Sequence, residues 1–254
     1  MPVEHCSDTD EGFDEWLVAF REHAVADGIA RDVVTRALGD VAYDPSVIEL
    51  DRTQRAHKVG FEVFAVSHVT PARVKRGKRL LSEHAVLLAR IEARFGVAPE
   101  IIVALWGLET DFGAYQGRTR SLEALATLAY DCRRAERFRG ELSTALRIVQ
   151  RGDLAPGEMV GAWAGELGQT QFLPSSYEQF GVDFDEDGRI DLIGSVDDAL
   201  ASTASYLAGH GWRAHEPYGP GTANVAVLEE WNKSEVYRRT VLLFATKLVP
   251  PKRG

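Results

Sequence analysis

The sequence contains only two cysteines, Cys6 and Cys132, among its 254 residues. Two isolated cysteines do not form a metal-ligand pattern, which needs several Cys or His residues at short spacings. Cys6 lies in an N-terminal segment, residues 1–12, that we expect to be mobile, so free thiols are favoured over a disulfide. Cysteine usage alone therefore leaves the redox compartment of the protein undecided.

Long hydrophobic runs are also absent. No stretch supplies the roughly 20 uncharged apolar residues that span a bilayer. Residues 1–14 contain no apolar run of the kind found in a secretory signal. The sequence therefore predicts a soluble chain without an export signal. With 45% hydrophobic residues, the chain can bury a core as one large domain or as two closely joined lobes.

Several motifs of common enzyme classes are missing. The seven histidines form no His-Glu-x-x-His pair, and the sequence has neither a glycine-rich phosphate loop nor a Gly-x-Ser-x-Gly turn. These absences exclude zinc hydrolases, nucleotide-binding enzymes and serine hydrolases of those types. The net charge of −9, from 38 acidic and 29 basic residues, argues against a nucleic acid partner.

Helical periodicity dominates what is present. Residues 13–26 and 31–38 carry apolar side chains at helical spacing, and the only candidate strands are short, near 190–193 and 224–228. The sequence therefore predicts a mainly α fold with very little strand. Further helical segments are expected over residues 47–50, 51–64, 72–95, 122–130, 135–151 and 196–210.

One glutamate stands out within a short predicted helix. Pro99 suits the first turn of that helix and Gly113 suits its end. Glu109 follows Leu105 and Trp106 by four and three residues, so its carboxyl shares a face with large apolar groups. A partly desolvated carboxyl has a raised pKa and can donate a proton to a glycosidic oxygen. From position alone, a solvated glutamate at the helix end is an equal alternative.

A second chemical feature is an acidic loop that resembles the start of an EF-hand. Carboxylates occupy its positions 1, 3 and 5, and Gly188 stands at position 6. Gly194 occupies position 12, where an EF-hand has an acid, so Asp197 or Asp198 would have to close a longer loop. The pattern predicts a structural Ca²⁺ or Na⁺, against the alternative of a metal-free polar turn. The candidate ligands are Asp183, Asp185, Asp187, Arg189 and Asp198.

Five blocks of sequence, in this order, carry a family resemblance. They are Ala-Leu-Trp-Gly-Leu-Glu-Thr-Asp-Phe-Gly at 104–113, Asp-Cys-Arg-Arg at 131–134, and residues 165–177, 183–191 and 206–212. With these blocks the chain resembles the membrane-bound lytic transglycosylase B family, the lysozyme-like peptidoglycan lytic transglycosylases of glycoside hydrolase family 103. The resemblance runs over residues 13–212 and resumes over 231–248.

The resemblance implies a domain organisation around a lysozyme-like helical core. The expected parts are a helical N-terminal lobe at 13–97, a catalytic core with the EF-hand-like loop at 98–212, a shortened connection at 213–230, and a C-terminal helix at 231–254 that packs back on the core.

The resemblance also implies a reaction without a catalytic cofactor. Glu109 would be the sole acid and base: it would protonate the oxygen that links N-acetylmuramic acid to N-acetylglucosamine, then deprotonate the muramyl C6 hydroxyl as it attacks C1. The product would be a 1,6-anhydromuramyl end. Asp111 is not expected to be a second catalytic carboxylate, because residues two apart point to different helix faces.

Further site residues follow from the resemblance, position by position. Arg133 and Arg134 would lie near the peptide and muramyl groups. The glycan groove would be formed by Gln171, Phe172, Leu173, Tyr206, Trp231, Asn232 and Tyr237. Aromatic faces stack on sugars, and arginines pair with carboxylates. Taken singly, each aromatic residue could instead belong to the core and the two arginines could be a solvated pair.

Some positions depart from the family pattern. Ala162 stands in place of a common serine, Phe64 in place of a groove tyrosine, and Glu166 in place of a small residue, which puts subsite contacts in doubt. The connection at 213–230 is shorter than the family leads us to expect, which predicts a more open groove.

The expected partner is therefore peptidoglycan, and the protein is expected to be a monomer. Its expected location, the periplasm, is inferred from the substrate alone. Two alternatives stay open: a muramidase that hydrolyses the same bond, and a non-catalytic peptidoglycan-binding scaffold.

Overall fold

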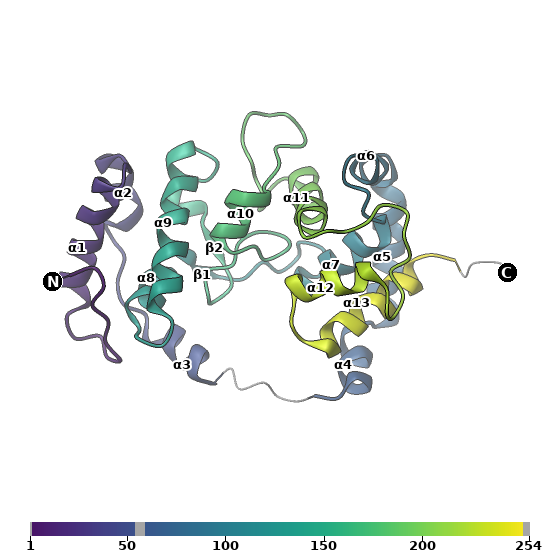
Figure 1. The fold of residues 1–254 in the computed structure, drawn as a ribbon, viewed down its shortest axis with the longest axis horizontal. Coiled ribbons are helices and arrows are strands. Elements are labelled where there is room, and N and C mark those ends of the chain that lie inside the picture. Colours follow the sequence, from purple (N-terminus) through teal and green to yellow (C-terminus); the bar gives the residue numbers. More distant parts are fainter. Residues whose placement is uncertain (1, 54–58, 251–254) are drawn as a thin grey trace. The chain divides into compact units, whose positions relative to one another are not determined.

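The computed structural model describes residues 2–53 and 59–250 of the chain. Within those residues, thirteen α-helices and two strands of two residues each confirm the predicted mainly α fold (Figure 1). The elements are α1 (Phe13–Ala26), α2 (Arg31–Leu38), α3 (Pro45–Thr53), α4 (Phe61–His68), α5 (Pro71–Glu83), α6 (Ala85–Phe95), α7 (Pro99–Thr110), β1 (Thr119–Arg120), α8 (Ser121–Tyr130), α9 (Ala135–Arg151), the 3-10 helix η1 (Pro156–Glu158), β2 (Val160–Gly161), α10 (Pro174–Phe180), α11 (Val196–Gly209), α12 (Ala223–Trp231) and α13 (Glu235–Leu248).

The chain forms two compact units, each assembled from separate stretches of sequence. The first unit takes the described residues of Met1–Ala56 together with Gln116–Gln179 and Gly188–Asp191; the second takes the remainder. Helices α1–α3, α8 and α9 therefore belong to the first unit, and α4–α7 and α11–α13 to the second. This division differs from the expected consecutive segments 13–97 and 98–212, because each of those contributes to both units.

The core of the first unit forms around α8. Every residue of α8 except Glu123 is buried, and the helix packs against α9, α3 and α2. Trp16 of α1 is fully buried and lies 5.4 Å from the ring of Tyr130. The two strands pair antiparallel, with Thr119 opposite Gly161. Helix amphipathicity at 13–26 thus gives the buried face that the sequence predicted.

The core of the second unit forms around α7. Residues 101–107 of this helix are all buried, and α13, α5, α11 and α6 pack around it. Gly107 is required at one of these contacts, because a Cβ there would lie 2.7 Å from ring carbons of both Phe112 and Phe244. The predicted start of this helix at Pro99 is confirmed, and its last residue is Thr110.

Several predicted elements differ from the observed ones. The helix expected over 72–95 is divided at His84, so that α5 and α6 are separate helices. Residues 224–228 lie in α12 rather than in a strand, and 190–193 form no strand. A short apolar run fits the spacing of a strand as well as that of a helix, which explains the error at 224–228. Of the segment expected over 51–64, residues 54–58 lie outside the described residues.

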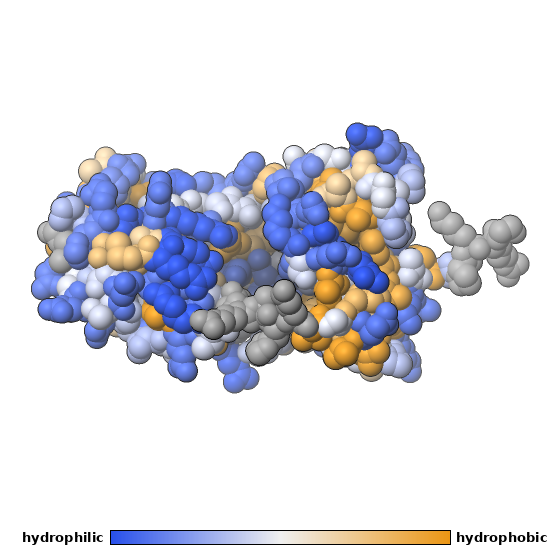
Figure 2. All heavy atoms as spheres, turned by 60° about the horizontal axis from the view of Figure 1, so that its bottom comes forward, coloured by the Kyte–Doolittle hydropathy of each residue, from blue (hydrophilic) through white to orange (hydrophobic). Residues whose placement is uncertain are grey.

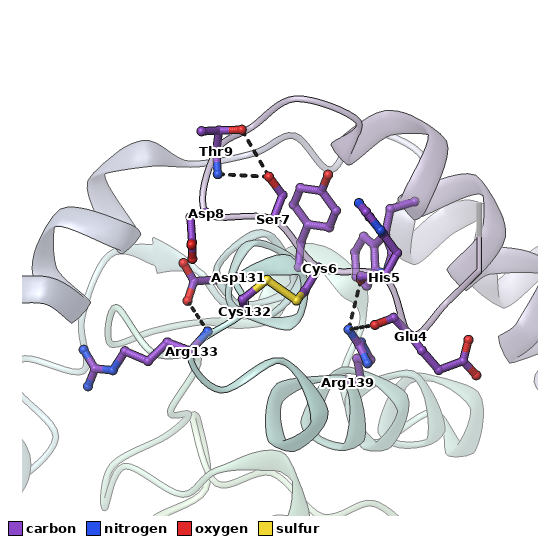
Figure 3. The surroundings of a disulfide bond; sticks show 12 residues. Glu4, His5, Cys6, Ser7, Asp8, Thr9, Asp131, Cys132, Arg133 and Arg139 are labelled. Carbon is purple, nitrogen blue, oxygen red and sulfur yellow. Dashed lines mark hydrogen bonds between the residues drawn. A yellow bond between two sulfur atoms is a disulfide. The ribbon is translucent and has the colours of Figure 1, made fainter.

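The expectation of free thiols is wrong, because Cys6 and Cys132 form a disulfide across 126 residues of sequence (Figure 3). The N-terminal segment is held at further points: the Arg139 guanidinium donates to the carbonyl oxygens of Glu4 and His5 at 2.9 and 3.0 Å. Sequence spacing could not reveal this pairing, since it depends on which segments the fold brings together.

On the face drawn in Figure 2, apolar surface is seen mainly on the second unit, although Val18 and Leu50 of the first unit are exposed too. On α4, Val63 and Val66 leave 66% and 77% of their surface exposed. None of the described helices has the length and apolar content needed to cross a membrane.

The disulfide should contribute to stability, because it restricts the unfolded chain. We expect the double variant Cys6→Ser/Cys132→Ser to lose about 2 to 4 kcal/mol of unfolding free energy. Thermal unfolding followed by circular dichroism measures this loss. A reductant should lower the melting temperature of the parent protein to that of the variant and leave the variant unchanged. A parent protein insensitive to reductant would contradict this prediction.

Candidate active site

Glu109 lies in the last turn of α7, and its side chain is half-buried. Residues 101–107 of the helix are all buried. Glu109 comes two residues later, where the helix reaches the surface. The structure therefore places the predicted acid beside the core of the second unit, in the surroundings that the sequence predicted.

Two hydrogen-bond donors converge on one oxygen of Glu109. The indole N–H of Trp231, the last residue of α12, donates to Oε1 at 2.9 Å. The Tyr237 hydroxyl, in the first turn of α13, donates to the same oxygen. With Oε1 fixed as an acceptor, a proton carried by the acid form of Glu109 belongs on Oε2.

The pKa of Tyr237 is raised well above its usual value. Burial is the largest cause, followed by the charge of Glu109 and the hydrogen bond to it. A phenol with a raised pKa stays protonated, so Tyr237 remains a hydrogen-bond donor to Glu109 throughout the neutral range.

Two more of the predicted residues support this arrangement. The Tyr206 ring packs edge-on against Trp231, with centroids 5.1 Å apart, and its hydroxyl donates to the carbonyl of Glu230 at 2.7 Å. Asn232 joins α12 to α13: its N–H donates to the Leu228 carbonyl at 3.0 Å, and its Oδ1 accepts from the Ser234 N–H at 2.9 Å. The structure thus brings Tyr206, Trp231, Asn232 and Tyr237 together near Glu109.

Asp111 is held by two arginines of α5. Its Oδ1 accepts from Arg73 Nε and its Oδ2 from Arg76 Nη1, both at 2.9 Å. That Asp111 is not a second catalytic carboxylate stays a prediction. Neither arginine was predicted from the sequence, although their spacing of three residues places them on one face of the helix.

In the first unit, the predicted groove residues 171–173 have unequal exposure. Gln171 has a left-handed backbone (φ 59°), and its side-chain amide donates to the carbonyls of Gly168 and Gln116 at 2.9 and 3.2 Å. Phe172 is buried, which fits the alternative of a core residue, whereas Leu173 is half-buried. A role for these residues in binding glycan stays a prediction.

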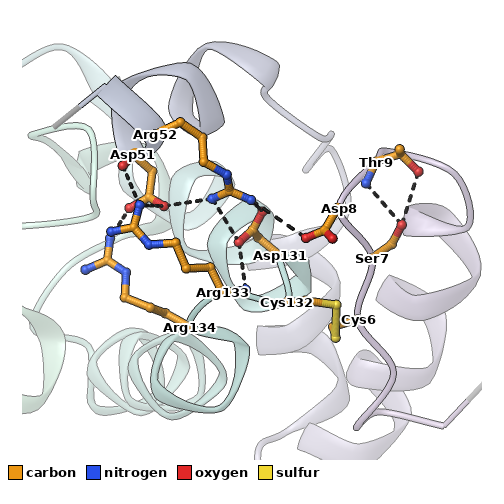
Figure 4. A network of polar contacts seen from close by, with 10 residues as sticks. All are labelled: Cys6, Ser7, Asp8, Thr9, Asp51, Arg52, Asp131, Cys132, Arg133 and Arg134. Atoms are coloured by element: carbon orange, nitrogen blue, oxygen red, sulfur yellow. Dashed lines mark hydrogen bonds and ion pairs between the residues drawn. A yellow bond between two sulfur atoms is a disulfide. The ribbon is translucent and has the colours of Figure 1, made fainter. Parts of the chain in front are cut away.

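Arg133 and Arg134 belong to a cluster of ion pairs beside the disulfide (Figure 4). Both contact the buried carboxylate of Asp51, Arg133 at 3.0 Å. Arg52 contacts the same carboxylate at 3.0 Å and also pairs with Asp131, which is buried too. Nothing in the sequence indicated that Asp51, Arg52 and Asp131 are their partners. The arginines have a structural role here, and contact with substrate stays a prediction.

The acidic loop brings three carboxylates together. One oxygen each of Asp183, Asp185 and Asp198 lies within 4.8 Å of the others, which makes this a candidate cation site among the described residues. Asp198 lies in the first turn of α11, beyond position 12 of the loop. It is one of the two residues that were predicted to close a longer loop. Asp187 is exposed and its N–H donates to Asp183 Oδ1 at 3.2 Å.

Arg189, the fifth predicted ligand, falls in the first unit, where its guanidinium pairs with Asp191 at 2.7 Å. The carboxylate cluster by itself fits a hard cation, because clustered carboxylates at this spacing repel one another unless positive charge is present.

The three departures from the family pattern have defined surroundings. Glu166 accepts a hydrogen bond from the Ala164 N–H at 3.2 Å, and burial raises its pKa. The N–H of Ala162 donates to the Glu166 carbonyl at 3.0 Å. The Phe64 ring stacks on His68, with centroids 3.9 Å apart. Each departure therefore has a structural contact of its own.

Comparison with known proteins decides the family. Residues 12–222 match the family model described as "Transglycosylase SLT domain". The chain belongs to this family. Over 145 residues it is 44% identical to membrane-bound lytic murein transglycosylase B of Escherichia coli K12. That alignment covers 57% of this chain and 40% of the relative, so the chain spans well under half of the curated relative's length.

Solved structures agree with this assignment. The SLT-domain chain is similar to SltB3 of Pseudomonas aeruginosa in complex with NAG-anhNAM-pentapeptide, with a TM-score of 0.88 and 32% identity over 94% of this chain and 80% of that one. It is also similar to the lytic transglycosylase Slt35 of Escherichia coli in complex with calcium, with a TM-score of 0.82 and 27% identity over 97% and 96% of the two chains. The predicted lysozyme-like fold is confirmed by these matches.

The contact between Glu109 and Tyr237 predicts a shift in titration. We expect Glu109→Gln to lower the pKa of Tyr237, because the substitution removes a negative charge that opposes ionisation of the phenol. Since the folded-state pKa exceeds that of an unfolded tyrosine, Tyr237 stabilises the parent protein below about pH 10, and this contribution is lost as the pH rises further. Carbon-13 NMR of labelled tyrosines across alkaline pH measures the shift.

Glu100→Gln is the matched control for that titration. The Tyr218 hydroxyl donates to Glu100 at the other end of α7, and burial together with this contact raises the pKa of Tyr218. The control should move the Tyr218 signal and leave Tyr237 unchanged. Identical Tyr237 titrations in the parent protein and in Glu109→Gln would contradict the contact.

Proposed function

We propose that this protein is a peptidoglycan lytic transglycosylase and that Glu109 is its single acid and base. The observation that carries the proposal is the geometry at Glu109: a half-buried carboxyl with Trp231 and Tyr237 both donating to Oε1. Membership of the SLT transglycosylase family and the likeness to SltB3 and Slt35 support the same assignment.

The proposed reaction regenerates the enzyme without water. Glu109 in its acid form gives the proton on Oε2 to the glycosidic oxygen, and the bond from that oxygen to C1 of N-acetylmuramic acid breaks. The C6 hydroxyl oxygen of the same sugar then bonds to C1, and its proton passes to the Glu109 carboxylate. Proton donation and proton acceptance thus use one group in sequence.

The two donors to Oε1 favour the intermediate stage of this reaction. After Glu109 has given up its proton, it carries a negative charge beside the core of the second unit. Hydrogen bonds to a charged group contribute about 1.5 to 3 kcal/mol each, more than those to a neutral one. Trp231 and Tyr237 therefore stabilise the Glu109 carboxylate until it accepts the proton of the C6 hydroxyl.

A single carboxylate is sufficient for this chemistry. Glycosidases that use two carboxylates need the second to activate water or to form a covalent bond to the sugar. Here an internal hydroxyl replaces water, and Asp111 is occupied by Arg73 and Arg76. The muramidase alternative would require water to attack C1 at the same site.

The proposed substrate is the glycan strand of peptidoglycan with its peptides. SltB3 is described in complex with both NAG-anhNAM-pentapeptide and NAG-NAM-pentapeptide. In this chain, we propose that Arg133, whose side chain is 46% exposed, pairs with a carboxylate of the peptide, while Gln171 and Leu173 contact the sugars. The remaining predicted contacts are Arg134, Phe172, Tyr206, Trp231, Asn232 and Tyr237.

We also propose that the protein works in the periplasm as a monomer. Peptidoglycan is met outside the cytoplasm, and the Cys6–Cys132 disulfide is typical of proteins in an oxidising compartment. The disulfide thus adds an argument for this location that is independent of the substrate.

Mass spectrometry of the products tests the proposed reaction. Purified peptidoglycan treated with the parent protein should release anhydromuropeptides, each one water lighter than the hydrolysed product, whereas Glu109→Gln should release none because it has no proton to give. Glu100→Gln, on the same helix, is the control and should stay active. Products with reducing ends would favour a muramidase, and silence from the parent protein would favour a binding scaffold.

We further propose that the carboxylate cluster in the acidic loop binds a structural Ca²⁺. Asp183, Asp185 and Asp198 supply hard oxygen ligands, which suit calcium. Ser195 donates to Asp185 Oδ2 at 2.8 Å and orients that carboxylate. The calcium complex of the similar Slt35 supports this proposal. Bound calcium would join the loop to the first turn of α11 and would take no part in the reaction.

Calcium should stabilise the protein through this cluster. With Ca²⁺ at 100 times its dissociation constant, we expect a gain of about 2.7 kcal/mol over a sample in chelator. Differential scanning calorimetry measures this gain, with Na⁺ tested in parallel. Asp185→Asn should abolish it, whereas Glu186→Gln, in the same loop but outside the cluster, should keep it. An equal gain in parent protein and Asp185→Asn would contradict the assignment.

A further inference from the structure

Three consecutive residues directly after the last turn of α7 have left-handed backbone conformations. Asp111, Phe112 and Gly113 have φ values of 50°, 61° and 75°. Glycine adopts this region freely and Asp tolerates it, but Phe does so only where the surrounding structure holds it there. This strained turn begins two residues after Glu109, so whatever holds it also fixes the end of the helix that carries the acid.

The Asp111 side chain is the first constraint on this turn. Arg73 Nε and Arg76 Nη1 each donate to a different carboxylate oxygen, both at 2.9 Å. Arg73 is itself anchored, because its Nη1 donates to the carbonyl of His68 at 2.8 Å. The Arg76 guanidinium also lies 5.3 Å from the centroid of the Phe112 ring. One helix, α5, therefore holds both of the left-handed residues that are not glycine.

Backbone and packing contacts complete the constraint. The Phe112 N–H donates to the Trp106 carbonyl at 3.1 Å, and the Gly113 N–H donates to Thr110 Oγ1 at 2.8 Å. The Phe112 ring is buried and meets the Trp106 ring edge-on, with centroids 5.6 Å apart. The turn is thus folded back against α7, and its only charged side chain is the one that the arginines bind.

We propose that Arg73, Arg76 and Asp111 form a positioning clamp for the acid. The clamp fixes the last turn of α7, so that the Glu109 carboxyl stays in register with the donors Trp231 and Tyr237. Its effect on catalysis rests on the proposed function, whereas its effect on the position of Glu109 does not. None of the three clamp residues transfers a proton.

The clamp differs from other ion pairs of the same helix. Arg79 and Glu83 form an ion pair within α5 at 2.9 Å, with 61% and 47% of their side chains exposed. In the clamp, the exposed fractions are 23% for Arg73, 37% for Arg76 and 38% for Asp111. Exposed ion pairs of this kind contribute little to the stability of a protein. Arg79→Gln is therefore a matched control: it removes one arginine from α5 without removing a contact to Asp111.

The indole signal of Trp231 reports the position of Glu109. The sequence has five tryptophans, so the indole N–H region of a nitrogen-15 spectrum holds few peaks, and Trp231→Phe assigns one of them. Because the Trp231 N–H donates to Glu109 Oε1, displacement of the acid should shift its peak and speed its hydrogen exchange. We expect both changes in Asp111→Asn and in Arg76→Gln, and neither in Arg79→Gln.

Kinetics on peptidoglycan supply the second readout. Asn accepts the left-handed backbone, so Asp111→Asn removes the charge without straining the turn further. We expect kcat to fall about tenfold in Asp111→Asn and in Arg76→Gln, with KM unchanged, because a displaced acid impairs proton transfer and not binding. Arg79→Gln should match the parent protein in both constants.

The two readouts separate the possible failures. An unmoved Trp231 signal in both clamp variants overturns the clamp, and so does an unchanged kcat with only a lower melting temperature, since that would be a structural role alone. A parent protein that cleaves no peptidoglycan would refute the proposed function, and the Trp231 signal would then decide the clamp by itself.

Discussion

The convergence of two donors on one oxygen of Glu109 is the interaction around which the second unit is organised. Trp231 ends α12 and Tyr237 lies in the first turn of α13, so the short segment between these helices must bring both side chains to the same atom. Asn232 holds that segment through its contacts with Leu228 and Ser234. As a result, one oxygen of the Glu109 carboxyl accepts hydrogen bonds from both ends of this segment.

A half-buried acid at the end of an apolar helix needs a rigid support. Helix α7 supplies it by burying residues on all of its faces, with the glycine at position 107 allowing Phe112 and Phe244 to approach. The strained turn that follows is stable only because Asp111 is neutralised and Phe112 is packed. Apolar packing thus fixes the body of the helix, while charge pairing fixes the end that carries Glu109.

The sequence predicted what depends on local pattern and missed what depends on distant contacts. The helix from Pro99 and the position of Glu109 on it follow from spacing, and both were confirmed. Trp231 and Tyr237 were reached only through a family resemblance, because no local rule connects them to a residue more than 120 positions earlier. Arg73 was missed because an arginine facing solvent and one facing a carboxylate have the same sequence pattern. The disulfide was missed because sequence spacing does not show which segments the fold brings together.

The first unit shows how a binding role and a structural role compete for the same side chains. Asp51 and Asp131 are buried, and a buried carboxylate is tolerated only when it is paired and hydrogen-bonded. The arginines at positions 52, 133 and 134 provide this pairing. If a ligand bound all three, Asp51 and Asp131 would be left as unpaired buried charges, which costs several kcal/mol. Asp8, which is exposed, also pairs with Arg52 at 3.8 Å, so three guanidinium groups meet three carboxylates. Arg133 is the most exposed of the three arginines, and this exposure is what supports the proposal that a peptide carboxylate pairs with it.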